Sequence, residues 1–274
     1  MEGEKRSRTR RVAATLRLMG HYVRFNLSAG MEYRASFFAQ VFGMALNNSA
    51  FVVFWLILYE RIGGSIRGYE LGDVMFLWSL AAAGIGLAMA ICGNAGSLSR
   101  LIYSGELDVY LLQPKPILPN MLASRMSISA WGDVLYGLLL FVFTQRITPA
   151  NVAFFAVFTL LMALGFVSIQ ILYHSLTFLW GNAEEIAGTA SELVLSFTLY
   201  PGSIFEGPSR WLLHSLLPAG LLAYVPASLF REFHLPTFLL LLGSDAALVA
   251  VSVGAFHLGL RRYESGSSLV ATRQ

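Results

Sequence analysis

The residues of this sequence that could carry chemistry are few, and most of them lie in apolar stretches. Of the 274 residues, 56% are hydrophobic and 13% are charged. The chain contains no Gly-x-x-x-x-Gly-Lys-Ser/Thr phosphate loop, no His-Glu-x-x-His pair and no Gly-x-Ser-x-Gly elbow. Its single cysteine, Cys92, allows neither an internal disulfide nor a zinc site. We therefore expect a non-catalytic chain, without a metal site or a cofactor of its own.

Polar side chains within apolar stretches are the remaining candidates, because ionisable groups in a membrane usually face protein or a cavity. Gln170 and His174 are four residues apart and share one helix face, where a hydrogen bond between helices is favoured over a substrate path. Asp133 is a candidate for a functional or dimer contact, whereas Arg125 either snorkels to the surface or meets Glu192. The full set of intramembrane candidates is Asn47, Asn48, Arg125, Asp133, Gln170, His174 and Glu192.

Long apolar runs must position these side chains. A helix needs about 20 mostly apolar residues to cross a bilayer. Runs of this kind fall near residues 36–59, 73–93, 119–143, 152–179, 190–205 and 237–260. They predict an all-α integral membrane protein whose six transmembrane helices occupy residues 36–260, with Arg125 and Asp133 both in the third helix.

The region 201–236 is ambiguous because an apolar stretch over residues 211–230 is broken by Pro218 and Pro226. A seventh span would need an unbroken helix. We expect short re-entrant or interfacial helices on the outer side, shielded by protein. A crossing by residues 211–230 remains the alternative.

The N-terminal segment, residues 1–35, has a different pattern. Apolar and basic side chains alternate at helical spacing on opposite faces, the first set being Val12, Leu16, Met19 and Val23 and the second Arg10, Arg17, His21 and Arg24. This predicts an interfacial amphipathic helix, with a solvated basic arm as the alternative. Basic residues also follow the last run, so the positive-inside rule places both termini, including the tail 261–274, in the cytoplasm. The same rule explains the basic charge without nucleic-acid binding.

The loop 97–117, between the second and third runs, is the most informative polar stretch. Small and acidic residues interrupt its apolar ones around Gly105. A short helix–turn–helix against the inner membrane face would present Glu106 and Asp108 to a cytoplasmic partner. In that arrangement the side chains of Leu107, Tyr110 and Leu111 pack inward. The alternative is an ordinary connecting loop.

Three stretches together resemble a known family. Ile102-Tyr-Ser-Gly-Glu-Leu-Asp-Val-Tyr-Leu-Leu-Gln-Pro114 is similar to the cytoplasmic signature of ABC-2 type exporter permeases. Two further pieces resemble one bacterial branch of that family, whose members have about this length and were long described as a domain of unknown function. These pieces are Tyr200-Pro201 with Leu217-Pro218 and Tyr224-Val-Pro226-Ala, and Gly259-Leu-Arg-Arg-Tyr-Glu-Ser-Gly266.

The resemblance implies a membrane subunit of an exporter in the bacterial inner membrane, with an interfacial helix, six spans and re-entrant helices after the fifth. It implies a second permease chain, either a copy or a related sister. It also implies a separate nucleotide-binding ATPase subunit that binds ATP and Mg and docks on the loop after the second span. The positions carried over for this docking are Arg100, Ser104, Gly105, Glu106, Leu107 and Asp108. The family exports drugs, peptides, lipids and glycans, and the sequence does not select among them.

Two other functions stay open. An ATP-independent secondary transporter would need ion-coupling residues or paired broken helices near the midplane. The sequence shows no such pair and few midplane charges, so Asp133 would have to carry the coupling. A membrane assembly factor that does not transport would bind the same partner without moving a substrate.

Overall fold

The structure is a computed structural model and describes residues 2–205, 207, 213 and 218–264. Within these residues the chain forms helices and turns and no strand, which confirms the all-α prediction. The expected elements that fall on residues 206, 208–212, 214–217 and 265–274 lie outside the described residues.

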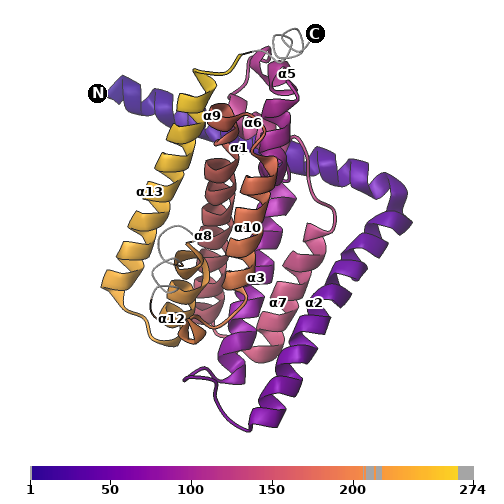
Figure 1. The fold of residues 1–274 in the computed structure, drawn as a ribbon, viewed down its shortest axis with the longest axis vertical. Coiled ribbons are helices and arrows are strands. Elements are labelled where there is room, and N and C mark those ends of the chain that lie inside the picture. Colours follow the sequence, from indigo (N-terminus) through magenta and orange to yellow (C-terminus); the bar gives the residue numbers. More distant parts are fainter. Residues whose placement is uncertain (1, 206, 208–212, 214–217, 265–274) are drawn as a thin grey trace.

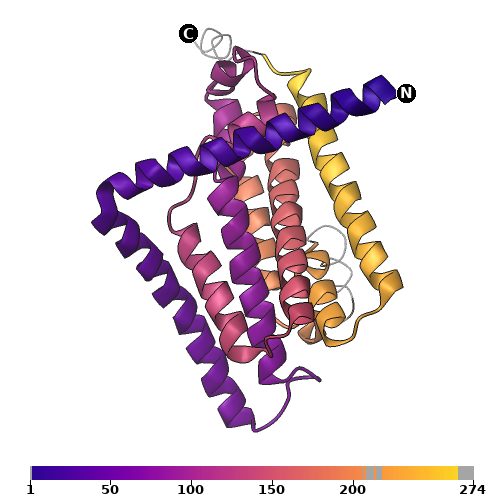
Figure 2. The same cartoon turned by 180° about the vertical axis from the view of Figure 1, so that it is seen from behind.

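The first two helices meet at a corner. Helix α1 (Glu2–Gly30) lies crosswise over one end of the other helices, and the 3-10 turn η1 (Met31–Tyr33) connects it to α2 (Arg34–Ile62) (Figures 1 and 2). A helix is thus present where the amphipathic pattern predicts one. The last described residues after α13 (Leu235–Leu260) lie at the same end of the molecule as α1 (Figure 1).

The remaining long helices form a bundle around α3. Helices α2, α3 (Leu71–Ile91), α7 (Ala130–Thr144), α8 (Pro149–His174), α10 (Glu184–Thr198) and α13 run alongside one another in alternating directions (Figure 1). Four stretches in the described part are long and apolar enough to cross a membrane: Val12–Ile62, Leu71–Ile91, Pro149–Trp180 and Leu235–Leu260. In the 18-residue apolar part of α3, 78% of the residues are buried. The corresponding share is only 11% in the first stretch and 17% in α13. Helix α3 is therefore central, whereas α2 and α13 are peripheral.

The predicted third helix, residues 119–143, is wrong as a single element. The chain instead forms α6 (Ile117–Ala123) and α7, with an irregular segment at 124–129. Backbone and hydroxyl groups find other partners there: Ser127 N donates to Met89 O at 3.1 Å, and Ser124 Oγ donates to Met121 O at 2.8 Å. Arg125 is consequently an exposed residue of this segment and not part of a spanning helix.

The predicted fifth helix, residues 190–205, is shifted. Helix α10 begins at Glu184 and ends at Thr198, before Pro201. Because α7 and α10 have 15 residues each, they are about 22 Å long, shorter than the roughly 30 Å hydrocarbon core. By length and composition, four stretches in the described residues therefore meet the criterion for a span, where the sequence predicted six.

Short elements cover both ends of the bundle. At the end near α1 lie η2 (Ala95–Ser97), α4 (Leu98–Tyr103), α5 (Leu107–Leu111), α6 and α9 (Thr177–Trp180) (Figure 1). After α10 come the turn η3 (Gly202–Ile204), the π-helical turn η4 (Gly220–Tyr224) and α12 (Val225–Arg231). Stacking of Phe76 on Phe230, with ring centroids 3.8 Å apart, packs α12 against α3.

Glycines allow α7 to approach both of its neighbours closely. A Cβ added at Gly137 would lie 2.5 Å from Ala83 N of α3, and one added at Gly132 would overlap with Val41 O of α2. Both contacts are with backbone atoms, which cannot rotate away as a side chain can. The two glycines of α7 therefore allow α7 to pack closely against α2 at Gly132 and against α3 at Gly137.

Candidate coupling site

The loop after α3 folds as a helix–turn–helix. Helix α4 ends at Tyr103, the chain reverses at Gly105 and α5 begins at Leu107. Gly105 has φ +82°, a left-handed conformation that other L-residues rarely adopt. Ser104 Oγ donates a hydrogen bond to Glu106 Oε1 at 3.2 Å across the turn. This geometry explains why the turn requires glycine and a small polar residue before it.

Apolar side chains attach one side of this element to the protein. Leu98, Leu101 and Ile102 of α4 and Leu107 of α5 are buried in a cluster with residues of α6, α8 and α13. Tyr110 packs against the same cluster. The prediction that Leu111 packs inward is wrong: its side chain is exposed, because α5 is only five residues long and the chain turns at its end.

The other side is open and largely apolar. Tyr103, Val109 and Leu111 are exposed, and 88% of Leu112 is accessible. Arg100 and Glu106 are also exposed, and Asp108 is half-buried. The open side of the tip thus combines apolar and charged side chains. The tip itself extends beyond the ends of the long helices (Figure 1).

A buried polar cluster joins α4 to the end of α8. Ser99 Oγ lies 2.7 Å from His174 Nδ1 and accepts a hydrogen bond from Thr177 Oγ1 at 2.8 Å. Ser99 and His174 are both almost inaccessible. Sequence reasoning singled out His174 but missed Ser99 and Thr177, which are small polar residues in apolar surroundings.

Amide side chains join the same loop to α6 and α1. Asn94 Nδ2 donates to Met121 O at 3.0 Å and to Ser124 Oγ at 2.8 Å, and Tyr110 Oη lies 2.8 Å from the same Ser124 hydroxyl. Two links run to α1: Tyr22 Oη donates to Asn120 Oδ1 at 2.5 Å, and Asn26 Nδ2 donates to Ala123 O at 3.1 Å. None of these residues was predicted as a site residue. Asn120, a fully buried amide within an apolar run, is the one that its sequence context could have revealed.

The other intramembrane candidates make separate contacts. Gln170 Oε1 accepts from Ser191 Oγ of α10 at 2.5 Å, and Asp133 Oδ1 accepts from Asn48 Nδ2 of α2 at 2.7 Å. Gln170 and His174, predicted to share a face, therefore reach two different partners.

Three candidates are exposed instead. Asn47, Arg125 and Glu192 all have exposed side chains, and no ion pair joins Arg125 to Glu192 although both are described. The structure therefore does not gather the intramembrane candidates into one site. It pairs Asn48 with Asp133 and places Gln170 and His174 at separate helix contacts.

The opposite end of the bundle carries its own polar contacts. Arg231 at the end of α12 forms a salt bridge with Asp73 of α3 (3.2 Å) and donates to Gly68 O at 3.2 Å. Its guanidinium also lies over the ring of Tyr69, 5.5 Å from the centroid. Burial raises the pKa of Tyr69, Arg231 opposes this shift and Asp73 adds to it. These contacts hold the end of α12 against the start of α3.

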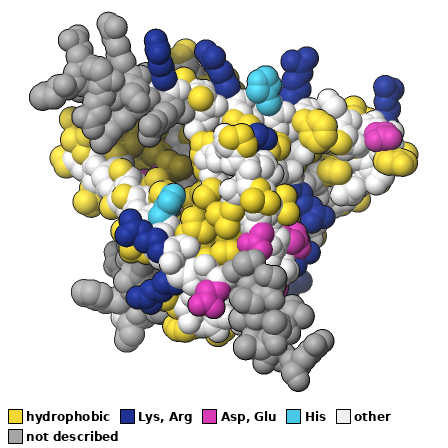
Figure 3. Space-filling view, turned by 90° about the horizontal axis from the view of Figure 1, so that it is seen from above, with side chains coloured by type: hydrophobic (Ala, Val, Ile, Leu, Met, Phe, Trp, Pro, Cys, Tyr) yellow, Lys and Arg dark blue, Asp and Glu magenta, His cyan; other side chains and the backbone are white. Residues whose placement is uncertain are grey.

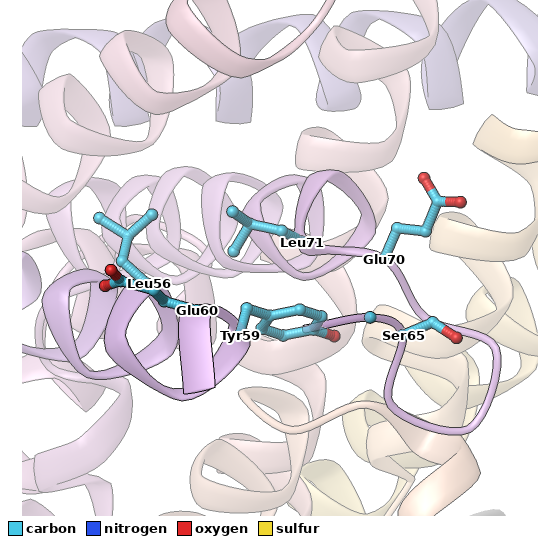
Figure 4. A pocket seen from close by; sticks show the side chains of 7 residues that line it. Leu56, Tyr59, Glu60, Ser65, Glu70 and Leu71 are labelled. Atoms are coloured by element: carbon cyan, nitrogen blue, oxygen red, sulfur yellow. The ribbon is translucent and has the colours of Figure 1, made fainter. Parts of the chain in front are cut away.

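A pocket of about 740 Å³ opens beside this end, between α2 and the start of α3. Figure 4 shows Tyr59 between Glu60 and Glu70, whose carboxyl groups point apart. The described residues contain no group of three or more His, Cys, Asp or Glu side chains that could hold a metal ion. The two carboxyl groups that line this pocket, Glu60 and Glu70, are therefore not part of such a group.

A comparison with protein-family models identifies the family to which the chain belongs. Residues 45–267 match the family model described as ABC-2 family transporter protein. Comparisons with curated proteins and with solved structures gave no match. The matched region includes the α4–α5 tip and every helix from α3 to α13. With the apolar helical bundle, this match shows that the chain belongs to the ABC-2 transporter family, as a multi-pass membrane permease component.

Proposed function

We propose that this chain is the membrane-spanning subunit of an ATP-driven exporter in the bacterial inner membrane. ATP hydrolysis with Mg takes place on a separate nucleotide-binding subunit, and this chain has no catalytic role. The observation that carries the proposal is the α4–Gly105–α5 tip, with its exposed apolar side chains at the end of a membrane protein.

The tip has the composition of a protein contact. Exposed apolar side chains that gather at one place, with polar groups around them, mark interaction sites. Val109 and Leu112 supply the apolar surface, and Glu106 supplies an exposed negative charge beside it. An ATPase subunit that binds here would hold the element through its open side.

The contacts behind the tip could carry movement into the bundle. Ser99 hydrogen bonds with His174 at the end of α8, and the Asn94–Ser124–Tyr110 contacts connect α5 to the segment before α7. The approach of two ATPase subunits on ATP binding would shift α4 and α5 as a unit, and these hydrogen bonds would transmit the shift to α8 and α7.

The rest of the arrangement supports an alternating-access permease. We propose six crossings by α2, α3, the α6–α7 pair, α8, α10 and α13, with both termini in the cytoplasm. The alternating helix directions and the position of the last described residues near α1 support this topology (Figure 1). The η4–α12 element would be re-entrant on the outer side, where substrate leaves. A second permease chain, a copy or a sister, would complete the path.

The test is co-purification with the ATPase encoded beside this chain. The two proteins are expressed together and purified through a tag on the permease, and bound ATPase and ATP turnover are measured. We expect Glu106→Lys and Leu112→Asp to reduce the bound ATPase or its turnover, because both change the open side of the tip. Gly105→Trp should have the same effect because it strains the turn, where φ is +82°. Ile147→Asp is the matched control, since Ile147 is an exposed apolar residue in the loop between α7 and α8, at the other end.

Stoichiometric binding by the wild type, lost in the three tip variants and kept in Ile147→Asp, supports the proposal. Wild-type binding and turnover in all four variants would show that the tip is not the docking site. A stable permease that never binds the ATPase would favour a secondary transporter.

A further inference from the structure

A groove at the end of α13 is not explained by the proposed coupling site. It lies between α8–α9 and the last turns of α13 and has a volume of about 500 Å³. Leucine side chains form most of its wall, and two arginines lie at its end: Leu172, Leu176, Leu179, Leu258, Arg261 and Arg262. Among the described residues that line it, none is acidic.

The floor of the groove is built by close packing and does not depend on a ligand. A Cβ added at Gly259 would lie within 2.9 Å of three side-chain atoms of Phe178, so α13 and α9 touch at this glycine. Phe178 also packs edge-to-face on the fully buried Phe256, with centroids 5.6 Å apart. The groove is therefore a preformed feature between two apolar helices.

The charge of the groove and its position at the end of α13 both limit which ligand can bind there. Arg261 is the C-cap of α13, so the two guanidinium groups lie where the apolar helix ends. Both arginines are exposed. Figure 3 views this end of the molecule and shows Lys and Arg side chains around it, with apolar side chains between them. A ligand that fits must combine a long apolar part with an anionic group at the level of the helix end.

We propose that this groove is a binding site for one acidic phospholipid of the membrane leaflet at the α1 end. An acyl chain would lie against Leu172, Leu176 and Leu258, and the phosphate would contact Arg261 and Arg262. Basic pockets between transmembrane helices on the cytoplasmic side bind such headgroups through this combination of contacts. The proposal rests on membrane insertion alone and does not require an ATPase partner.

The test is native mass spectrometry of the purified chain in detergent, titrated with phosphatidylglycerol or phosphatidylcholine. We expect one retained phosphatidylglycerol and much weaker retention of phosphatidylcholine. Arg261→Gln with Arg262→Gln should weaken phosphatidylglycerol binding by about 30-fold, because each basic residue near a membrane surface adds roughly a factor of five for anionic lipid. Leu179→Trp, a substitution at an exposed wall position, should weaken both lipids by narrowing the groove.

The matched control is Arg17→Gln with Arg24→Gln, which removes the same charge from exposed positions on α1. Retention in this control, with loss in the groove variants, supports a specific site. Equal loss in both double variants would show general attraction of acidic lipid and overturn the proposal. A folded groove variant that keeps its lipid but changes its oligomeric state would assign the groove to a protein contact instead. Thermal unfolding of each variant separates loss of lipid from loss of fold.

Discussion

Ser99 of α4 and His174 of α8 are joined by a buried hydrogen bond, with 2.7 Å between Ser99 Oγ and His174 Nδ1. The two residues are 75 positions apart in the chain. Ser99 stands at the start of the helix–turn–helix and His174 is the last residue of α8, which runs through the bundle. This hydrogen bond is a direct polar connection between the proposed docking tip and a long apolar helix.

Ser99→Ala should therefore lower both stability and coupling. The substitution leaves the buried His174 Nδ1 and Thr177 Oγ1 without their common partner, which costs about 1–3 kcal/mol. We expect a lower unfolding temperature in detergent and reduced ATP turnover at unchanged ATPase binding. Ser228→Ala is the control, because Ser228 is exposed and its hydroxyl bonds only within its own helix region. Equal unfolding temperatures for the two variants would mean that the Ser99 contact contributes nothing measurable.

The long helices of the fold could be predicted from the sequence, and two shorter ones could not. Apolar runs locate α3, α8 and α13 to within a few residues, because lipid requires continuous apolar helices there. The run over 119–143 hides a break, since its two charged side chains, Arg125 and Asp133, hardly lower the mean hydropathy of so long a run. Glu184 and Glu185 lower the local hydropathy, so the apolar run begins later than the helix does. Both residues nevertheless suit the first turn of α10, where the helix dipole favours negative charge.

Only some residues of the candidate site could be predicted from the sequence. Gly105 and Leu107 could be found from sequence because a turn between short apolar pieces constrains both residue types. Ser99 and Asn94 could not, since their roles depend on partners 27 and 75 residues away. The docking role itself stays a prediction until the partner is present.

Gly137→Leu should prevent α3 and α7 from packing. Even a Cβ at this position would lie 2.5 Å from Ala83 N and 2.6 Å from Ser79 O, both backbone atoms of α3. We expect little monodisperse protein in size-exclusion chromatography after detergent extraction. Gly43→Ala is the control on α2, since a Cβ there meets nothing within 4 Å and alanine favours helix by up to about 1 kcal/mol. A normal yield of the Gly137 variant would show that the two helices are farther apart than described.

Arg231→Gln should loosen the end of α12 without unfolding the bundle. The variant loses the salt bridge to Asp73, the bond to Gly68 O and the position over Tyr69. Because Arg231 is about half exposed, the pair contributes only up to about 1 kcal/mol, so amide exchange over Val225–Arg231 should accelerate by up to roughly fivefold. Arg61→Gln, at an exposed site on α2, should leave this exchange unchanged. If both variants exchange alike, Arg231 does not hold α12 in place.

Asp133→Asn distinguishes a structural carboxylate from one that carries protons. Asp133 Oδ1 accepts a hydrogen bond from the buried Asn48 Nδ2 at 2.7 Å, and an asparagine amide oxygen can accept the same bond. An ATP-driven permease should therefore keep its fold and its ATP turnover in this variant. Asp133→Leu removes the acceptor and should lower the unfolding temperature, since hydrogen bonds between membrane helices contribute about 0.6 kcal/mol and up to roughly 1.7 kcal/mol.

The two Asp133 variants are compared in the same complex with the ATPase, by unfolding temperature and by turnover across a pH range. Normal turnover in Asp133→Asn with reduced stability only in Asp133→Leu identifies the residue as a helix-pairing group. If Asp133→Asn is as stable as the wild type but inactive, an ionisable group at this position is required. That outcome would show that the ATP-driven cycle needs a group that ionises at this position, because the asparagine amide oxygen still accepts the bond from Asn48 but the side chain cannot gain or lose a proton.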